Sequence, residues 1–415
     1  MISVQEAKTI ILNATQDFGV EEITFLKSVG RILKEDVRAD RDFPPFNRVS
    51  MDGIAINFTA FQNGQRSFTI EGIQPAGSPQ VTLQNPQNCI EVMTGSVLPK
   101  NTNTVIRYED ISIVNGIATI TIEEINEAQN IHQKGKDKKE GEVLIHQNKI
   151  ISAAEIGVLA TVGKSMVKVA KQPKVMIIST GDELVAVDEF PEEHQIRRSN
   201  VFTLVSLLER LHIPSETDHI TDDKPILKSK IKTYLEVYDV LLFSGAVSKG
   251  KFDYLPEVFE ELGVAKCFHK VAQRPGKPFW FGRTRHIKTK QNDLYKIEKN
   301  NNKRQAVIFA FPGNPISTFV NCLVYFCAWY QKSEGLTVKE ETAILDSDIA
   351  FTPNLVYFLQ VKLAYKLGQL VACPVTGNGS GDLASLANAD AFIQLPNDKT
   401  DFKKGEVYPV LRYRN

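Results

Sequence analysis

The chain has 415 residues, of which 42% are hydrophobic and 24% are charged, a composition that supports a large buried core and excludes global disorder. At roughly 150 residues per domain, this length predicts two to four domains. Basic and acidic residues number 49 each, and this balance argues against a nucleic-acid-binding protein, which usually carries a basic excess. Any attraction for an anion must therefore come from a local cluster of cations.

The cysteines and histidines show no disulfide or metal-binding pattern. The five cysteines are an odd number without a CxxC pair, and no HExxH segment occurs, which argues against a disulfide framework and structural zinc. Glu6 and Lys8 interrupt the stretch where a signal peptide needs an apolar core, and the apolar run 319–330 is too short to span a bilayer. We therefore expect a cytoplasmic protein without a membrane partner.

The first predicted elements are two helices that flank a β-rich insertion. Residues 3–13 and 152–163 have helical spacing of apolar residues, and each begins with a Ser-x-x-Glu capping box. Between them, four short runs of β-favouring residues are separated by Gly, Pro and Asn clusters: 67–70, 89–93, 104–108 and 117–122. The charged segment 132–142 is interpreted, on its composition alone, as a solvated turn.

Strands and helices then alternate, which predicts a doubly wound, mainly parallel α/β domain. The predicted strands are 175–179, 240–244 and 307–311, and the predicted helices are 200–211, 222–238, 254–262 and 315–330. The polar stretch 283–304 is typical of an exposed hairpin tip or inserted loop. From residue 333 onward, short alternating runs (357–363, 369–374, 391–395, 407–411) predict a small β-barrel or sandwich.

These sequence patterns predict four domains. They are a discontinuous N-terminal linker domain (1–41 and 141–171), an inserted β-rich domain (42–140), an α/β domain (172–331) and a C-terminal β-barrel domain (332–415).

Three predicted strands of the α/β domain end in glycine-containing loops with polar side chains. The loops are TGDE (180–183), SGAVSKG (244–250) and PGNP (312–315), and the carboxyl ends of parallel strands share one edge, where ligands bind. Glycine lets the backbone approach a phosphate, and Asn314 and Pro315 suit the N-cap and first position of a helix that faces an anion. Each loop alone could be a simple turn, but turn chemistry does not explain Glu183 and Ser248.

Two further segments add charge to this edge. In QRPGKP (273–278), Arg274 and Lys277 flank a Pro-Gly turn, an arrangement that fits an oxyanion or phosphate, with an ordinary charged surface turn as the alternative. Asp222 and Asp253 follow strand ends, and carboxylates beside a phosphate usually indicate Mg²⁺, although a lone loop aspartate is more often a helix cap. No general base is apparent.

The β-rich insertion has its own unusual segment, PPFNRVSMDG (44–53), in which rigid prolines lead to a single acid, Asp52, and Thr94 follows another strand. Farther along, GNGSG (377–381) resembles a phosphate loop only weakly, since it lies in a β-rich region. No GxGxxG follows a strand, and no Walker A motif occurs.

Taken in order, these segments resemble the MoeA-type molybdopterin molybdenumtransferases, which are related to the E domains of gephyrin and the plant Cnx proteins. The motifs are PPFNRVSMDGIAI, VMTGSVLP, STGDELV, RRSN, SGAVSKGKFD, QRPGKPFWFG, FPGNPIS and GNGSGDLASLANADAFIQLP. The resemblance implies the last step of molybdenum cofactor synthesis: molybdate and adenylylated molybdopterin react with a divalent cation, Mg²⁺, and AMP is released. It also implies homodimers of four-domain subunits, with each active cleft shared between the α/β domain of one subunit and the second domain of the other.

The resemblance also assigns roles to residues. It implies six catalytic residues: Asp52, Thr94 and Asp137, which would face the partner's cleft, and Glu183, Asp222 and Asp253, which would also hold Mg²⁺. The substrate-binding set implied by the motifs is Gly181, Ser248, Arg274, Lys277, Pro278, Pro312, Gly313, Asn314, Pro315, Ser317 and Ser380.

Three positions depart from the family pattern: Ala246 stands where glycine is common, Gln360 where a cation is usual and Asn103 where aspartate is usual. Two alternative functions stay open at this point, a non-catalytic molybdopterin-binding dimeric scaffold and a nucleotide pyrophosphatase built on the same α/β domain. As partners we expect small-molecule substrates and a transient contact with the molybdopterin adenylyltransferase.

Overall fold

The computed structural model describes residues 1–247, 253–284, 305–336 and 340–414. Contacts divide the chain into two compact units. The α/β unit comprises Met1–Glu21, Gly30–Ile32 and Val169–Asn415, and the insertion unit comprises Glu22–Val29 and Leu33–Lys168. The finer division into four domains stays a prediction. No helix in the described part of the chain has both the length and the apolarity to cross a membrane.

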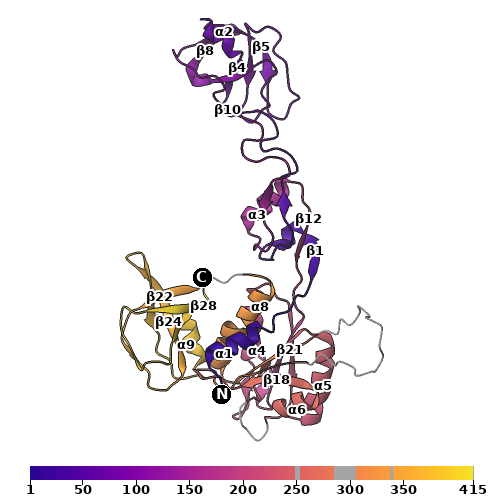
Figure 1. Cartoon of the computed structure of the whole chain (residues 1–415), viewed down its shortest axis with the longest axis vertical. Coiled ribbons are helices and arrows are strands. Elements are labelled where there is room, and N and C mark those ends of the chain that lie inside the picture. Colours follow the sequence, from indigo (N-terminus) through magenta and orange to yellow (C-terminus); the bar gives the residue numbers. More distant parts are fainter. Residues whose placement is uncertain (248–252, 285–304, 337–339, 415) are drawn as a thin grey trace, which may run out of the picture. The chain divides into compact units, whose positions relative to one another are not determined.

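The α/β unit is built on a six-stranded sheet (Figure 1). The first four strands pair in parallel, and only β20 runs in the opposite direction, between β21 and β18, which confirms the mainly parallel sheet. In spatial order the strands are β16 (Ser215–Ile220), β13 (Val175–Thr180), β17 (Val240–Ser244), β21 (Val307–Phe311), β20 (Trp280–Thr284) and β18 (Val264–His269).

Alternate residues of the central strands enter two separate hydrophobic cores, because helices cover both faces of the sheet. Ile177 and Leu242 pack in one core, and Ile178 and Leu241 pack in the other. This burial on both faces explains the continuous apolar runs in the sequence. The first core receives α1 (Val4–Leu12), α4 (Asn200–Glu209), α7 (Pro315–Asn321) and α8 (Ala328–Ser333); the second receives α5 (Lys224–Val237) and α6 (Leu255–Glu261).

One detail of these helices agrees with the sequence prediction and one differs from it. The capping box at Ser3 is confirmed, since the Ser3 side chain accepts from the Glu6 N–H and the Glu6 carboxylate accepts from the Ser3 N–H. The single helix predicted over 315–330 is wrong in its middle, where Cys322–Cys327 form a π-helical segment between α7 and α8. An apolar pattern does not distinguish α-helical from π-helical hydrogen bonding.

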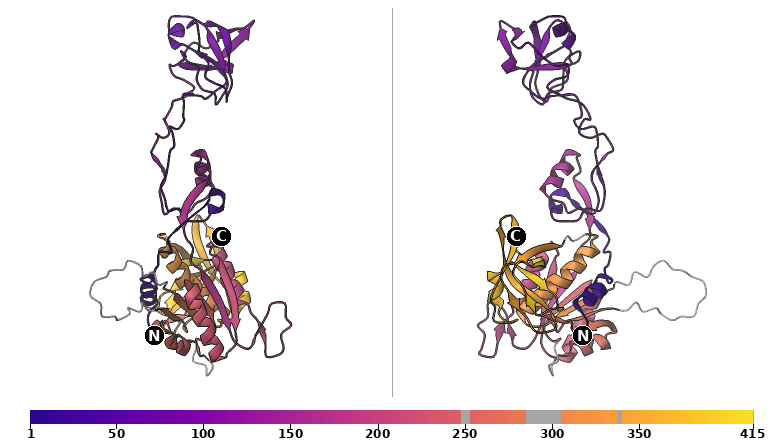
Figure 2. Two further views of the ribbon diagram at one scale, coloured as in Figure 1. Left: turned by 90° about the vertical axis from the view of Figure 1, so that its right-hand side faces the viewer. Right: turned by 60° about the vertical axis from the view of Figure 1, so that its left-hand side comes forward.

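The C-terminal region forms a closed five-stranded barrel, which resolves the earlier choice between barrel and sandwich. The barrel closes because β24 pairs with both β25 and β26. The short strand β19 (Gln273–Arg274) pairs with β24 and so brings the 273–278 loop to the barrel. The barrel strands, yellow in Figures 1 and 2, are β24 (Val356–Lys366), β25 (Gln369–Pro374), β22 (Glu341–Leu345), β28 (Val407–Arg412) and β26 (Ala391–Leu395).

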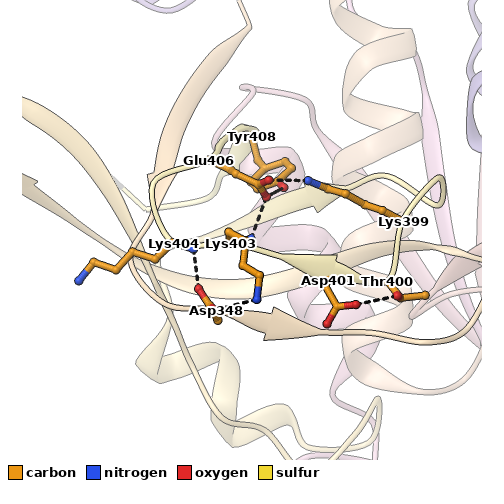
Figure 3. A network of polar contacts seen from close by, with 8 residues as sticks. All are labelled: Asp348, Lys399, Thr400, Asp401, Lys403, Lys404, Glu406 and Tyr408. Carbon is orange, nitrogen blue, oxygen red and sulfur yellow. Dashed lines mark hydrogen bonds and ion pairs between the residues drawn. The ribbon is translucent and has the colours of Figure 1, made fainter.

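Charged side chains on the barrel surface are paired among themselves (Figure 3). Glu406 accepts from Lys399 Nζ at 2.7 Å, from the Lys403 N–H at 2.8 Å and from the Tyr408 hydroxyl. Asp348 accepts from Lys403 Nζ at 3.0 Å. The hydrogen bond from Lys399, followed by those from Tyr408 and Lys403, lowers the pKa of Glu406 to about 2. These lysines are therefore engaged in local structure and do not form an open cationic patch.

The insertion unit contains a second six-stranded sheet, which confirms the predicted β-rich insertion. In order, its strands are β7 (Thr104–Arg107), β4 (Gly53–Ile56), β6 (Cys89–Val92), β5 (Ser67–Gln74), β9 (Ile117–Ile120) and β8 (Ile111–Val114). Later in the sequence, helix α3 (Ala153–Thr161) begins with the predicted capping box of Ser152 and Glu155. The two-stranded pair β3 (Arg48–Val49) and β10 (Ile131–His132) carries Arg48 and His132, the side chains next to the candidate residue Asp137.

Candidate functional site

Two cavities lie side by side in the α/β unit and share the lining residue Gly313. Cavity A, of about 480 Å³, is lined by the 273–278 loop, residues 312–317, β24 and the loop before α9 (Leu383–Asn388). Cavity B, of about 310 Å³, is lined by the ends of β13 and β17, residues 196–201 and two aspartates. The loops after β13, β17 and β21 therefore meet at one edge of the sheet.

Asn200, at the start of α4, connects these loops. Its Nδ2 donates to Ser244 Oγ at 2.9 Å and to the Gly313 carbonyl at 2.6 Å, and the Gly245 N–H donates to the Phe311 carbonyl at 3.1 Å. One carboxamide thus joins the N-terminal end of a helix to the ends of two parallel strands. This connection fixes the wall between cavities A and B.

Glycine is required at two positions around cavity B. Gly181 has a φ of +133° and Gly245 a φ of +112°, values that side chains rarely permit. A Cβ at Gly181 would lie 2.4 Å from Glu183 Oε2, and one at Gly245 would lie 2.8 Å from Thr180 Oγ1. The next residue, Ala246, has a φ of +51°, so the departure noted in the sequence places a methyl group on left-handed backbone.

Three predicted acids, Glu183, Asp222 and Asp253, all line cavity B. Burial raises the pKa of Asp222, and the negative charges of Asp182, Glu183 and Asp253 raise it further. The neighbouring acids therefore lie close enough to Asp222 to destabilise its charged form.

Two neighbouring aspartates, Asp222 and Asp223, have different roles at the start of α5. Asp223 is the helix cap, because its Oδ1 accepts from the Ile226 N–H at 2.9 Å. The Asp222 side chain is thereby left for the cavity, while its backbone N–H donates to Asp182 Oδ1 at 3.0 Å. The helix-cap alternative considered for the aspartates thus applies to Asp223 and not to Asp222.

The donor chemistry of cavity B fits Mg²⁺. Within the described ranges, no group of three or more His, Cys, Asp or Glu side chains has the geometry of a metal centre. Mg²⁺, however, keeps several waters and takes only one or two protein carboxylates. Burial raises the pKa of Asp222, the neighbouring acids raise it further, and a bound divalent cation would relieve this second contribution. The metal-binding roles of Glu183, Asp222 and Asp253 remain predictions.

Cavity A carries the two predicted cations, Arg274 and Lys277. Among the residues that the structure describes, neither side chain forms an ion pair with a carboxylate. Burial raises the pKa of Tyr357, which lies opposite Arg274 in the β19–β24 pairing, and the charge of Arg274 opposes that rise. Both cations are therefore available to an anion in the cavity.

A buried amide network fixes the loop that holds these cations. Gln273 is fully buried; its Nε2 donates to the Pro275 carbonyl and to Asn321 Oδ1, both at 2.9 Å, and its Oε1 accepts from the Tyr325 hydroxyl. Asn321 Nδ2 donates to the Gly276 carbonyl at 3.2 Å. Each polar atom of the Gln273 side chain therefore has a partner, and the Pro-Gly turn is held from below.

The PGNP loop also lines cavity A. Asn314 is the N-cap residue of α7 and Pro315 occupies its first turn, as predicted, although the Asn314 side chain makes no capping hydrogen bond. Asn314 Nδ2 instead donates to Ser380 Oγ at 2.7 Å, and the Ser380 carbonyl accepts from the Ile316 N–H at 3.1 Å. The other predicted residues that line this cavity are Pro278, Pro312, Gly313 and Ser317.

The neutral residue Gln360 also lines cavity A. Its side chain is buried and hydrogen-bonded to Ser385, with Nε2 and Oγ 3.0 Å apart. The position where the family usually has a cation is thus part of the same cavity as Arg274 and Lys277. Loss of one cation from this wall leaves the anion to those two side chains.

The insertion unit holds the three remaining candidates. Asp52 Oδ1 accepts from the Thr94 N–H at 2.6 Å and from its hydroxyl at 2.7 Å, and these bonds lower the pKa of Asp52. Asp137 Oδ1 lies 2.8 Å from His132 Nε2, and His132 Nδ1 lies 3.1 Å from Arg48 Nη2. Since arginine can only donate, His132 accepts through Nδ1 and donates from Nε2 to Asp137. Each exposed acid is thus oriented by a neighbour.

Two observations limit or extend the predicted set. Ser248 lies outside the described residues. Sequence reasoning did not single out Thr180 and Arg198, although both line cavity B. Arg198 belongs to the RRSN motif immediately before α4, and this position beside a helix start at the ligand-binding edge was the available clue.

Comparisons with known proteins agree over the whole chain. Residues 2–163 match a model of the MoeA N-terminal region (domain I and II), residues 176–327 a probable molybdopterin binding domain, and residues 342–413 the MoeA C-terminal region (domain IV). The molybdopterin molybdenumtransferase of Synechocystis sp. is 38% identical over 413 residues, which cover 99% of each chain.

More distant relatives agree with this match. The molybdopterin molybdenumtransferase of Staphylococcus aureus is 29% identical over 420 residues, covering 99% of this chain and 95% of its own. A crystal structure of the molybdopterin biosynthesis MoeA protein from Pyrococcus horikoshii covers 100% of both chains with a TM-score of 0.80 at 26% identity. None of these relatives favours the scaffold or pyrophosphatase alternative.

Proposed function

The chain belongs to the molybdopterin molybdenumtransferase family and is an enzyme of molybdenum cofactor biosynthesis, and on this premise we propose that it inserts molybdenum from molybdate into adenylylated molybdopterin in a Mg²⁺-dependent reaction that releases AMP. The observation that carries the proposal is the pair of adjoining cavities of opposite charge, with Arg274 and Lys277 in one and Glu183, Asp222 and Asp253 in the other. Two anionic reactants need such an arrangement, because each must be neutralised before they can approach.

In this proposal, cavity A holds molybdate. A charge-assisted hydrogen bond contributes about 1.5–3 kcal/mol, so two cations can hold a dianion in competition with water. The loop fixed by Gln273 presents Arg274 and Lys277 in a set geometry, which reduces the entropy lost on binding. Gly313 lies between the two anions, where the missing side chain leaves room for both.

Cavity B holds the phosphates of the adenylylated pterin. Glu183, Asp222 and Asp253 would hold Mg²⁺, which supplies positive charge to the phosphoanhydride when bound. The residues around the cavity then act by positioning and charge neutralisation, the factors that dominate phosphoryl chemistry. The described residues offer Gly181 and Gly245 for close backbone approach to these phosphates.

We also propose that the enzyme is a cytoplasmic homodimer in which Asp52, Thr94 and Asp137 of one subunit complete the cleft of the other. The support is the family resemblance and the oriented, exposed side chains of these residues. All five cysteines are free, as suits a reducing compartment. A transient contact with the molybdopterin adenylyltransferase would deliver the unstable substrate directly.

The decisive experiment incubates the purified protein with adenylylated molybdopterin, molybdate and Mg²⁺. We expect release of AMP and pterin-bound molybdenum in equal amounts, and neither product when molybdate or Mg²⁺ is omitted. No AMP release with any divalent metal would leave the scaffold, and cleavage of free dinucleotides without pterin would indicate a pyrophosphatase.

Subunit mixing tests the shared cleft. Asp52→Ala and Glu183→Ala should each lose transfer while the fold is kept. Heterodimers of the two variants contain one intact cleft if the site is shared, so mixing should restore part of the activity. No recovery after demonstrated subunit exchange would contradict a site that is shared between subunits.

A further inference from the structure

Arg198 is an arginine of cavity B whose charge has no partner among the residues that the structure describes. It follows the short strand β15 (Ile196–Arg197), and its backbone is fixed because its N–H donates to the Val185 carbonyl at 3.0 Å. Its Nε is buried without a hydrogen-bond partner, and its guanidinium forms no ion pair with any carboxylate in the described part of the chain. Buried donors are nearly always satisfied in folded proteins, so this one requires an explanation.

The adjacent arginine provides a direct contrast. Arg197 is exposed, and its Nε donates to the Glu189 carbonyl at 2.9 Å. The backbone of the same segment therefore offers an acceptor to one arginine and none to the next. A guanidinium that only stabilised this loop would be expected to use such an acceptor.

A second unsatisfied donor lines the same cavity. Thr180 Oγ1, at the end of β13, is buried without a hydrogen-bond partner among the described residues. The nearby imidazole of His219 does not supply a negative charge: burial lowers the pKa of His219 and the charge of Arg198 lowers it further, while its Nδ1 lies 3.1 Å from Ser179 Oγ. Two donors from separate loops thus lack an acceptor in one cavity.

The chemistry of these donors identifies the missing acceptor. A guanidinium presents a fork of N–H groups that matches two oxygens of a phosphate, and a hydroxyl can donate to a third. A metal cation does not suit this end of the cavity, because the guanidinium is positively charged and has no lone pair to donate to a metal. The acids Glu183, Asp222 and Asp253 line another part of the wall, where a cation can bridge to the same phosphate.

We propose that Arg198 and Thr180 form an oxyanion subsite in cavity B that holds a phosphate group of the nucleotide-bearing substrate. The inference deepens the proposed function, on which the identity of that substrate rests. It assigns the phosphate to cavity B and leaves molybdate to the cations of cavity A. Arg198 therefore determines which anion enters which cavity.

The test measures equilibrium binding of inorganic pyrophosphate, AMP and molybdate by titration calorimetry, with and without Mg²⁺, to the full-length chain and its variants. Arg198→Met removes the fork and also an unsatisfied buried donor. We expect at least a tenfold loss of affinity for pyrophosphate or AMP, unchanged molybdate affinity, and a melting temperature equal to or above that of the wild type. Whichever of the two phosphate probes depends on Arg198 identifies the phosphate that is held.

Three matched variants sharpen the result. Arg283→Gln removes the same charge from an exposed arginine that lines neither cavity, and it should change phosphate affinity by less than twofold. Arg198→Lys keeps the charge without the fork and should recover only part of the affinity. Thr180→Val should weaken binding severalfold without lowering the melting temperature, since it also removes an unsatisfied donor.

Several results would overturn the proposed subsite. The wild-type protein could bind neither phosphate probe, or the Arg198→Met variant could bind them as tightly as the wild type. A lowered melting temperature of Arg198→Met that Arg198→Lys does not restore would indicate a structural arginine. Tighter Mg²⁺ binding by Arg198→Met with unchanged phosphate affinity would show that the guanidinium only balances the acids. Because the assay needs no turnover, absence of molybdenum transfer would refute the proposed function and leave this result intact.

Discussion

Cavities A and B share Gly313 yet hold their charges in different ways. In cavity A, Arg274 and Lys277 sit on a loop whose shape is fixed by buried amide hydrogen bonds, and the charges face open space. In cavity B, burial raises the pKa of Asp222, and acids from two other loops raise it further. On the proposed assignment, the anion of cavity A would meet a preformed site, whereas the charges of cavity B would be balanced only after a cation and its substrate bind.

The largest expected effect is the loss of Glu183. Glu183→Gln keeps the size of the side chain and removes one of the charges that would hold Mg²⁺, so we expect transfer to fall by about 100-fold or more. AMP release in steady state measures the effect, and raised Mg²⁺ should recover part of it.

Glu193→Gln is the matched control, since Glu193 lines neither cavity. Equal losses in both variants, or full activity of Glu183→Gln, would remove Glu183 from the site.

Cavity A is tested by loss of either cation. Lys277→Met or Arg274→Met removes one charge-assisted contact, and the KM for molybdate should rise by about 10-fold to 100-fold, with a smaller change for the pterin substrate. The exposed Lys266, which lines neither cavity, provides Lys266→Met as a control. A rise confined to the pterin KM would exchange the assignments of the two cavities.

The preformed character of cavity A depends on Gln273. Gln273→Ala leaves the Tyr325 hydroxyl and Asn321 without their buried partner, so we expect a loss of about 2–3 kcal/mol in the free energy of unfolding and weaker molybdate binding. Urea unfolding and molybdate titration measure the two effects. Tyr325→Phe removes only one of these bonds and should show a smaller loss; loss of stability without any change in molybdate binding would show that the loop keeps its shape unaided.

The sequence predicted the strands that carry the site because they are buried on both faces and are apolar throughout. Strand β16, with the sequence SETDHI, was not predicted, since it lies at the edge of the sheet and has the composition of a loop. The glycine-acid loops were recognisable because each follows an apolar strand. Gln273 was part of a recognised motif, but its partners lie 48 and 52 residues away, so only the fold reveals its role.

The sequence shows which residues are charged, but it does not show which of their side chains are left without a partner and can contact a ligand. Asp222 and Asp223 are adjacent and identical, and helix α5 takes one of them as its cap. Arg197 and Arg198 are likewise adjacent, and a single carbonyl acceptor separates their environments. Such differences depend on tertiary contacts that local patterns do not contain.

The left-handed alanine in cavity B gives a smaller effect. Ala246→Gly should raise the free energy of unfolding by about 1 kcal/mol, because glycine adopts a φ of +51° without the Cβ penalty. Thermal unfolding measures the change. An unchanged or lowered stability would show that neighbouring residues compensate for this backbone conformation; raised activity in addition would show that the methyl group obstructs cavity B.

The smallest effect distinguishes the two adjacent aspartates by their response to pH. The folded-state pKa of Asp222 is raised above its ordinary value of 3.8, so the folded protein binds its proton more readily than the unfolded chain does. The charged form therefore costs stability at neutral pH, and that cost disappears as the pH falls through the folded pKa. Asp222→Asn should be slightly more stable than the wild type at pH 7, by less than about 1 kcal/mol, and the two should converge in acid.

Asp223→Asn is the control, because asparagine caps a helix about as well as aspartate and should leave stability nearly unchanged. Adding Mg²⁺ then tests whether the acids around Asp222 bind a metal or only repel one another. Added Mg²⁺ should raise the melting temperature of the wild type and of Asp223→Asn, but less that of Asp222→Asn, because the cation relieves a repulsion that this variant no longer has. An equal rise in melting temperature in all three proteins would show that Mg²⁺ does not bind at Asp222.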